Sequence, residues 1–172
     1  MNAIELLKAH HKKTKAALEK GSKGKLDAAE AKKAADELVA HMVIEEHVFY
    51  PRIRELMKDM VGESYEEHTT ARFALARALT AKGEDQVKAR FTVLKELIEH
   101  HVKEEEDDLF KSVKKALDSE ELEELGKKMK ARFAEVYAAG YQSVVPSSPS
   151  KTSADAARRS LHVPVKTKKR AA

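Results

Sequence analysis

Residues 40–51 read AHMVIEEHVFYP, an apolar stretch that carries two histidines and two glutamates and ends at a proline. This composition predicts a helix packed in a core, where ionisable side chains are costly unless something pairs with them. His41 and Glu45 are four residues apart, so on a helix they project the same way, one turn above the other. The stretch therefore predicts a polar site that faces the inside of a helical fold.

A second stretch, residues 100–110, reads HHVKEEEDDLF and repeats the arrangement with His101 and Glu105. Each of the two motifs is preceded by a single histidine: His11 lies 30 residues before the first motif and His68 lies 33 residues before the second. The chain thus contains two similar halves, each offering one histidine and then His-x-x-x-Glu. Such an internal twofold suits a pair of metal ions better than a single one.

The rest of the 172-residue sequence is typical of a helical protein: 36% of its residues are charged, 5% are aromatic, and Trp and Cys are absent. The lack of cysteine excludes disulfides, thiolate metal sites and cysteine nucleophiles. Asp27 and Asp118 are expected N-caps, and Pro51 is expected to kink the helix that contains it. The apolar periodicity predicts helices over residues 3–20, 27–60, 63–81, 84–117 and 119–140.

Four long helices joined by short loops predict an all-α fold, an up-down-up-down four-helix bundle with an additional C-terminal helix. The segment 84–117 shows the expected seam, since Phe91, Leu94 and Ile98 follow one another at steps of three and four. His101 and Glu105 occupy the next two seam positions. In each long helix a histidine stands where the pattern calls for an apolar side chain.

We expect two regions: a bundle domain over residues 1–140 and a disordered Ser/Pro/Lys-rich tail over residues 141–172. The tail holds seven Lys or Arg and one Asp, whereas the preceding residues hold 26 basic and 28 acidic groups, so the net charge of +4 comes from the tail. A solubilising extension is the favoured interpretation of the tail, and non-specific nucleic-acid binding is the alternative.

The targeting signals that a sequence can show are missing from this one. The N-terminal stretch MNAIELLKAHHKK has no apolar signal-peptide region, and no apolar run approaches the ~20 residues of a membrane span. We therefore expect a cytoplasmic protein without a membrane partner.

Charge burial strengthens the metal hypothesis. Two carboxylates facing each other in a core repel and raise each other's pKa, and cations between them remove this repulsion. Neutral imidazole and carboxylate suit iron, manganese or zinc, and the spacing alone does not choose among them. The competing interpretation is a set of scattered polar groups in a mobile bundle. Six polar residues at matched seam positions argue against a chance arrangement.

Four stretches of the sequence resemble the hemerythrin-like, or HHE cation-binding, domain: LLKAHH (6–11), HMVIEEHVFYP (41–51), EEH (66–68) and HHVKEEEDDLF (100–110). The resemblance implies a four-helix bundle around a non-haem, oxo-bridged centre of two iron ions. It also implies a ligand set by motif. His11 and His41 would hold one iron, His68 and His101 would hold the other, and Glu45 and Glu105 would bridge them.

The chain departs from the oxygen-carrying members at Arg72, where those members have a second histidine four residues after the third-helix ligand. One iron would then lack a protein ligand, and that position could be open or filled by water, Tyr or Glu. This favours a protein that reacts with or senses oxygen or hydrogen peroxide, including catalase-like peroxide consumption. The alternative is a non-enzymatic protein that binds, stores or senses oxygen or iron.

Several neighbouring polar residues fall off the seam, and we expect them to lie outside the site. His10, His47 and His100 are expected not to bind metal. Glu46, Glu104 and Glu106 are expected on solvated faces, with a ligand-orienting role as the alternative for Glu46. Tyr50 is expected to pack in the core with Phe49 rather than to present its phenol to the metals.

Overall fold

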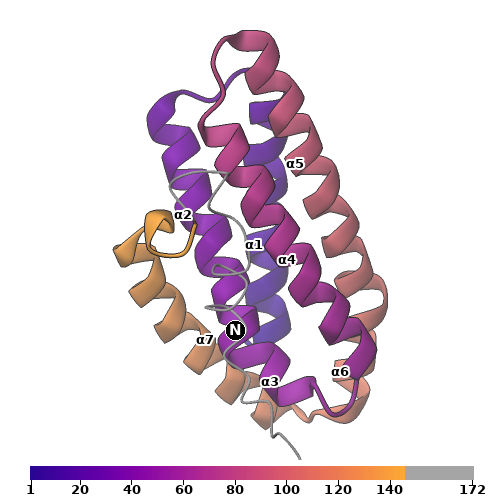
Figure 1. The fold of residues 1–172 in the computed structure, drawn as a ribbon. Helices are drawn as coiled ribbons and strands as arrows, with labels where there is room; N and C mark the ends of the chain where they lie inside the picture. Colours follow the sequence, from indigo (N-terminus) through magenta and orange to yellow (C-terminus); the bar gives the residue numbers. More distant parts are fainter. Residues whose placement is uncertain (146–172) are drawn as a thin grey trace, which may run out of the picture.

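The computed structural model describes residues 1–145, and these residues form helices and turns without a strand (Figure 1). The predicted all-α class is confirmed. The elements are α1 (Ala3–Ser22), α2 (Ala28–Ile44), the π-helical turn η1 (Glu45–Phe49), α3 (Tyr50–Ile53), α4 (Lys58–Leu79), α5 (Glu84–Glu104), the π-helical turn η2 (Glu105–Leu109), α6 (Phe110–Ala116), α7 (Ser119–Ala139) and the 3-10 turn η3 (Tyr141–Ser143).

Helices α1, α2, α4 and α5 make the predicted bundle (Figure 1). Helix α1 packs on both α2 and α5, and α4 packs on α5 and, less extensively, on α2. The additional helix α7 lies against α1 and α2, so it covers one side of the bundle and leaves the α4–α5 side without such a layer. Within residues 1–145, no helix has both the length and the apolar character that crossing a bilayer requires.

Three helices begin at capping boxes, which explains where they start. The side chains of Asn2, Asp27 and Asp118 accept hydrogen bonds from backbone N–H groups at the starts of α1, α2 and α7. In each case a glutamate three residues later bonds back to the cap, an arrangement that satisfies two otherwise unpaired donors. The two caps predicted from the sequence, Asp27 and Asp118, are confirmed.

The link between the second and third bundle helices differs from the prediction of one helix running to residue 60. The helix ends at Ile53, a turn covers residues 54–57, and α4 begins at Lys58. Met57 lies outside the helical region with φ −143° and ψ 51°, so the chain reverses there. Val61 and Gly62, which the expected helix bounds place in a link, lie inside α4.

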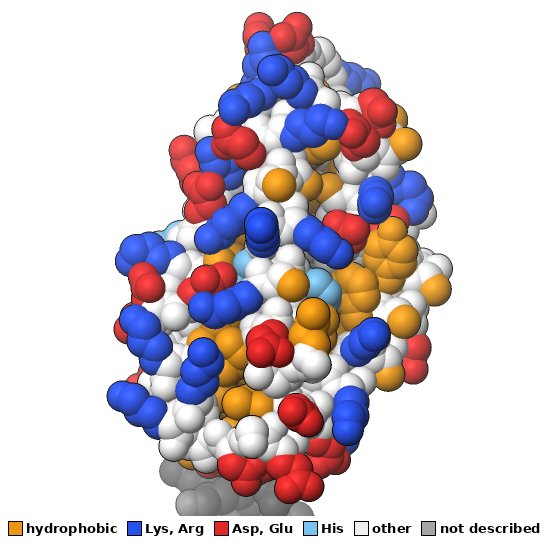
Figure 2. Space-filling model, turned by 180° about the vertical axis from the view of Figure 1, so that it is seen from behind, with side chains coloured by type: hydrophobic (Ala, Val, Ile, Leu, Met, Phe, Trp, Pro, Cys, Tyr) orange, Lys and Arg blue, Asp and Glu red, His pale blue; other side chains and the backbone are white. Residues whose placement is uncertain are grey.

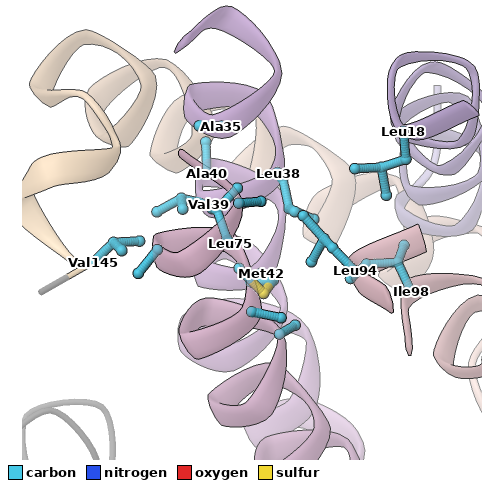
Figure 3. Packing of buried hydrophobic residues seen from close by; sticks show 14 of the residues in the cluster. Leu18, Ala35, Leu38, Val39, Ala40, Met42, Leu75, Leu94, Ile98 and Val145 are labelled. Atoms are coloured by element: carbon cyan, nitrogen blue, oxygen red, sulfur yellow. The ribbon is translucent and has the colours of Figure 1, made fainter. Parts of the chain in front are cut away.

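The buried apolar side chains form two clusters with a polar layer between them. One cluster contains Leu38, Leu94 and Ile98 and is shown in Figure 3. The other surrounds Phe49 and Phe110. Apart from Asp36, which lies among residues of the first cluster, the buried charged and imidazole side chains come from helix turns between these two clusters. The fold therefore holds its polar groups in the middle of the bundle.

Residues 141–145 belong to the packed structure, although we expected the tail to begin at Tyr141. The Tyr141 N–H donates to Oδ1 of Asp36 at 2.8 Å. Val145 is 5% exposed and packs against the cluster of Figure 3. The predicted tail over residues 146–172 lies outside the described residues.

Candidate metal centre

Each His-x-x-x-Glu motif ends at a π-helical turn. The Tyr50 N–H donates to the carbonyl of Glu45, five residues back, and the Phe110 N–H does the same to the carbonyl of Glu105. The sequence analysis placed a kink at Pro51, but the second π turn occurs without a proline after it. The two turns thus belong to the motif itself, and π turns inside α-helices are frequent at functional sites.

The six residues expected from the sequence all lie in the polar layer. Their exposed fractions are 1% for His11, 3% for His41, 0% for Glu45, 1% for His68, 3% for His101 and 1% for Glu105. Two groups of potential ligand atoms form, each within 4.8 Å: His11, His41, Glu45 and Glu105 in one, and Glu45, His68 and His101 in the other. The structure brings all six together, and Glu45 belongs to both groups.

The two glutamates lie between the two pairs of histidines. Glu45 places Oε1 3.3 Å from Nε2 of His41 and Oε2 3.3 Å from Nε2 of His68. Glu105 places Oε2 3.2 Å from Nε2 of His11 and 3.6 Å from Nε2 of His101. Each carboxylate therefore faces one histidine from each half of the molecule, which is the position that a bridging carboxylate requires.

Hydrogen bonding supports a cation at this point. In the described part of the chain, eight buried side-chain atoms lack a hydrogen-bond partner, and five of them face one another in the polar layer: Nε2 of His11, Nε2 of His41, Oε1 and Oε2 of Glu45, and Oε2 of Glu105. Buried polar atoms are nearly always paired, because an unpaired one loses its hydration without compensation. Since these five atoms face one another, a shared metal ion would satisfy them together.

Outer carboxylates orient three of the four imidazoles. Nδ1 of His11 lies 2.8 Å from Glu106, Nδ1 of His68 lies 3.0 Å from Glu46, and Nδ1 of His101 lies 2.7 Å from Glu67. A carboxylate at Nδ1 keeps the proton on that nitrogen and turns Nε2 inward as a lone-pair donor. The expectation of solvated faces for Glu46 and Glu106 is wrong, and the alternative role for Glu46 is the one observed.

The fourth imidazole, His41, has no such acceptor within residues 1–145. His10 lies beside it, with the two ring centroids 5.7 Å apart, and the His10 ring also packs on Phe133 of α7 at 4.4 Å. Burial and the charge of Lys13 lower the pKa of His10 to about 4. His10 is thus a neutral neighbour of the site and is not among the grouped ligand atoms.

The two imidazoles of the second half face each other directly. Nε2 of His68 and Nε2 of His101 are 3.0 Å apart. Nδ1 of each ring faces a carboxylate and carries a proton. If both imidazoles are neutral, the lone pairs of the two Nε2 atoms would therefore point at each other at this distance. Either a proton or a metal ion must therefore lie between the rings, and a metal ion would serve both nitrogens at once.

The pKa values of these groups show how the metal-free site holds its charge. Burial lowers the pKa of His11, but interaction with the nearby Glu105 and Glu45 carboxylates outweighs it and raises the pKa to about 10. Burial also lowers the pKa of His68, but Glu45 and Glu46 outweigh this effect and raise the pKa to about 9. Burial and nearby His11 hold the pKa of His41 well below its usual value. Protons on His11 and His68 would thus take the place of cations.

Arg72 and Tyr50 complete the site in ways that the sequence did not resolve. Arg72 is 6% exposed and donates to Oε2 of Glu46 at 2.7 Å, so it supports the carboxylate that orients His68. The Tyr50 hydroxyl donates to Oε1 of Glu105 at 2.9 Å and lies 3.4 Å from Nε2 of His68. Tyr50 does lie near Phe49, but the expectation that its phenol points away from the site is wrong.

The remaining histidines expected outside the site are at or near the surface. His47 is exposed and lies 3.4 Å from Arg132. The side chain of His100 is 65% exposed. Figure 2 shows the back of the molecule, where histidine side chains reach the surface among basic and acidic neighbours.

A bundle whose polar layer presents paired His-x-x-x-Glu motifs to a cation defines a helical metal-binding protein. The sequence matches the family of the Hemerythrin HHE cation binding domain over residues 2–113, and the chain belongs to this family. The resemblance noted in the sequence is therefore confirmed. Neither the curated proteins nor the solved structures include a match to this chain.

Proposed function

We propose that this protein binds two iron ions in the polar layer and that the centre reacts with oxygen or hydrogen peroxide. His11 and His41 would hold one ion, His68 and His101 the other, and Glu45 and Glu105 would bridge them. The carboxylate positions between the two histidine pairs support two ions over one. The unpaired buried atoms support the presence of a cation in the layer. The nitrogen and oxygen donor set suits iron and admits manganese or zinc.

Burial of the centre restricts what can react there. The six proposed ligands are each 0–3% exposed, so a large organic substrate has no direct access to the metal atoms. Molecules of the size of oxygen or peroxide pass through small fluctuations of a packed bundle. Apolar clusters on both sides of the layer keep the site dry and strengthen the electrostatic interactions within it.

The observation that carries the proposal is the pairing of Arg72 with Glu46, together with the placement of Tyr50. Arg72 occupies the position where oxygen-carrying relatives have a further ligand, and its guanidinium is engaged with Glu46 instead. On the His68 side of the centre, the Tyr50 phenol lies 3.4 Å from Nε2 of His68. On this side of the proposed centre, one protein ligand is therefore missing and a hydroxyl group lies close by.

Tyr50 would hold a proton at this position. Burial and the charge of Glu105 raise its pKa well above the ordinary value, so the phenol stays neutral and can donate a hydrogen bond. Glu105 accepts that hydrogen bond at rest and orients the hydroxyl toward the site. Bound iron would supply the electron-transfer chemistry that oxygen or peroxide requires, and the protein would supply a dry pocket and this proton donor.

The first test is the metal content of aerobically purified full-length protein, with the absorption spectrum of the same sample. About two irons per chain with near-ultraviolet oxo-to-iron bands support the proposal, and peroxide consumption is then assayed. Protein that stays metal-free after anaerobic reconstitution with ferrous iron contradicts it. Two bound irons without any peroxide or oxygen reaction would contradict the reactive function and leave the alternative below.

Replacement of Tyr50 by phenylalanine separates the role of its hydroxyl from its packing. We expect Tyr50→Phe to retain both metal ions and to lower peroxide turnover by about 10²-fold, the range for loss of a positioned proton donor. Tyr65→Phe is the matched control, since its hydroxyl donates to the backbone carbonyl of Glu46 at 3.0 Å and not to a proposed ligand. Equal turnover in the two variants would exclude a proton-donating role for Tyr50.

Reversible oxygen binding or iron storage is the second candidate function, and the near-complete burial of the ligands favours it. A dry site protects bound iron from water, as a reversible carrier needs. This function predicts a spectral change that appears with oxygen and reverses when oxygen is removed, with negligible peroxide turnover. Continuous peroxide turnover that His101→Ala abolishes would exclude it.

A further inference from the structure

A third group of potential ligands lies at the surface beside the buried layer. Nε2 of His100 is 3.7 Å from Oε1 of Glu67 and 3.4 Å from Oε1 of Glu104. The three donor atoms lie within 4.8 Å of one another and come from two helices, α4 and α5. The exposed fractions of these side chains are 65% for His100, 20% for Glu67 and 38% for Glu104.

Within the described residues, no Lys or Arg side chain balances the charge of this group. Among residues 1–145, neither Glu67 nor Glu104 forms an ion pair with Lys or Arg. Other surface carboxylates of the same helices do so, as Glu84 does with Lys88. Two carboxylates therefore face one imidazole, and a divalent cation would balance their charge while using all three donors.

The internal repeat of the fold does not require this group. By position within the two halves, Glu67, His100 and Glu104 correspond to His10, Ala40 and Ile44. In the first half these positions lie under the α7 side of the bundle, where His10 packs on Phe133 and the other two side chains are buried. Among residues 1–145 no helix covers the second half in this way, and there the same positions carry one histidine and two glutamates.

We propose that Glu67, His100 and Glu104 bind a third divalent metal ion, of the zinc or ferrous class, at the surface of the α4–α5 side. Three protein donors leave coordination positions for water, as in an open site. The i, i+4 spacing of His100 and Glu104 directs both side chains the same way on α5, and Glu67 completes the group from α4. This inference does not depend on the function proposed for the buried centre.

Glu67 links this site to the buried one. Its Oε2 accepts a hydrogen bond from Nδ1 of His101 at 2.7 Å, while its Oε1 faces His100. An ion bound by Oε1 withdraws electron density from the carboxylate that orients a proposed ligand of the centre. The third ion is thus separated from the His101 imidazole by a single carboxylate group.

Equilibrium dialysis of metal-free full-length protein against zinc, followed by elemental analysis, tests the proposal. We expect the wild-type chain to bind one more ion than His100→Ala, and Glu104→Gln to hold that ion at least about tenfold more weakly. His47→Ala is the matched control, because it also removes an exposed histidine and should bind as many ions as the wild type. His100 is largely exposed, so its replacement should leave the fold intact.

The outcomes separate this site from the buried centre. Three ions for the wild type and two for His100→Ala support both sites, and one ion against none supports the third site while contradicting the centre. Equal stoichiometry in the wild type and His100→Ala overturns the proposal. Loss of an ion in His47→Ala as well would also overturn it, since the effect would then not belong to this group.

Discussion

The imidazoles of the centre are held by carboxylates that follow the internal repeat. Glu46 and Glu106 each come one residue after a proposed bridging glutamate, and each bonds to the single histidine of the other half. Glu46 is buried deeply and shared with Arg72, whereas Glu106 is 30% exposed at its side chain and lies near Lys8. The second half of the site is therefore the more rigidly oriented one.

Replacement of Glu46 by glutamine tests how strongly that orientation matters. We expect Glu46→Gln to weaken binding of one metal ion about 10–100-fold, because His68 loses its charged acceptor and Arg72 loses its partner. Competitive titration with a chelator measures the affinity of each ion. Glu66→Gln, at an exposed position of α4, serves as the control and should leave both affinities unchanged.

Spacing alone identified the six proposed ligands, and it missed the residues that orient them. His41, Glu45 and their repeat stand at seam positions, which helical periodicity reveals without a structure. Glu67 and Glu106 reach their imidazoles across helices, so their roles depend on the relative register of two helices. The one sequence signal that could have found Glu106 is its equivalence to Glu46 in the repeat.

At the scale of elements, the two π turns decide which residues follow the motifs into the site. On an unbroken α-helix, residues five apart point about 140° away from each other. The π turns add a residue, so Tyr50 lies beside His68, with ring centroids 5.6 Å apart, and Phe110 lies beside His11 at 5.8 Å. Helical periodicity predicts regular α-helices here, and a regular α-helix would direct the Tyr50 phenol away from the site.

Helix α7 depends on close approach to the N-terminal residues. A Cβ atom at Gly126 would lie 2.7 Å from the carbonyl oxygen of Met1 and 2.9 Å from the Ala3 nitrogen. These are backbone atoms that cannot turn aside, so Gly126→Ala should destabilise the fold by about 1–3 kcal/mol. Urea unfolding followed by circular dichroism measures the change.

The control for this change lies in another helix. Gly62 is exposed within α4 and has no atom within 4 Å of an added Cβ, so Gly62→Ala should stabilise by about 0.5–1 kcal/mol. Opposite signs for the two glycines would show that close packing of α7 is the cause. A gain of stability at both positions would contradict the contact between α7 and residues 1–3.

At the scale of the whole molecule, the metal-free protein should lose stability as the pH rises. His11 and His68 have folded-state pKa values of about 10 and 9, above the 6.5 of an unfolded chain. Between pH 6.5 and these folded-state pKa values, the folded state therefore binds more protons than the unfolded state. The stabilisation from His11 and His68 is complete below pH 6.5 and is lost as the pH rises through 9–10. Melting temperatures of chelator-treated protein at pH 6.5 and 9.5 measure this.

Metal loading should change that dependence, because cations take the place of the two protons. The loaded protein should keep its melting temperature over the same pH range, and loading near neutral pH should release protons. A metal-free melting temperature that stays constant or rises toward pH 9.5 would contradict the proposed protonation of His11 and His68.

Two truncations define where the packed part of the chain ends. Removal of residues 146–172 gives the reference chain, which retains every described contact. Removal of residues 141–172 should lower the free energy of unfolding by about 2–4 kcal/mol, since Val145 is 5% exposed and the Tyr141 N–H bonds to Asp36. Equal stability of the two truncated chains would contradict this packing.

The repeat within the centre has a consequence for how such a site can be built. Each half contributes one histidine, one His-x-x-x-Glu motif, one π turn and one aromatic ring after it, so the smallest unit of the centre is a helical hairpin. Two identical hairpins would reproduce all six proposed ligands but would present either two phenols or none. The single hydroxyl at Tyr50, opposite the bare ring of Phe110, is therefore a difference between the halves, and it would make the two proposed metal positions chemically unequal.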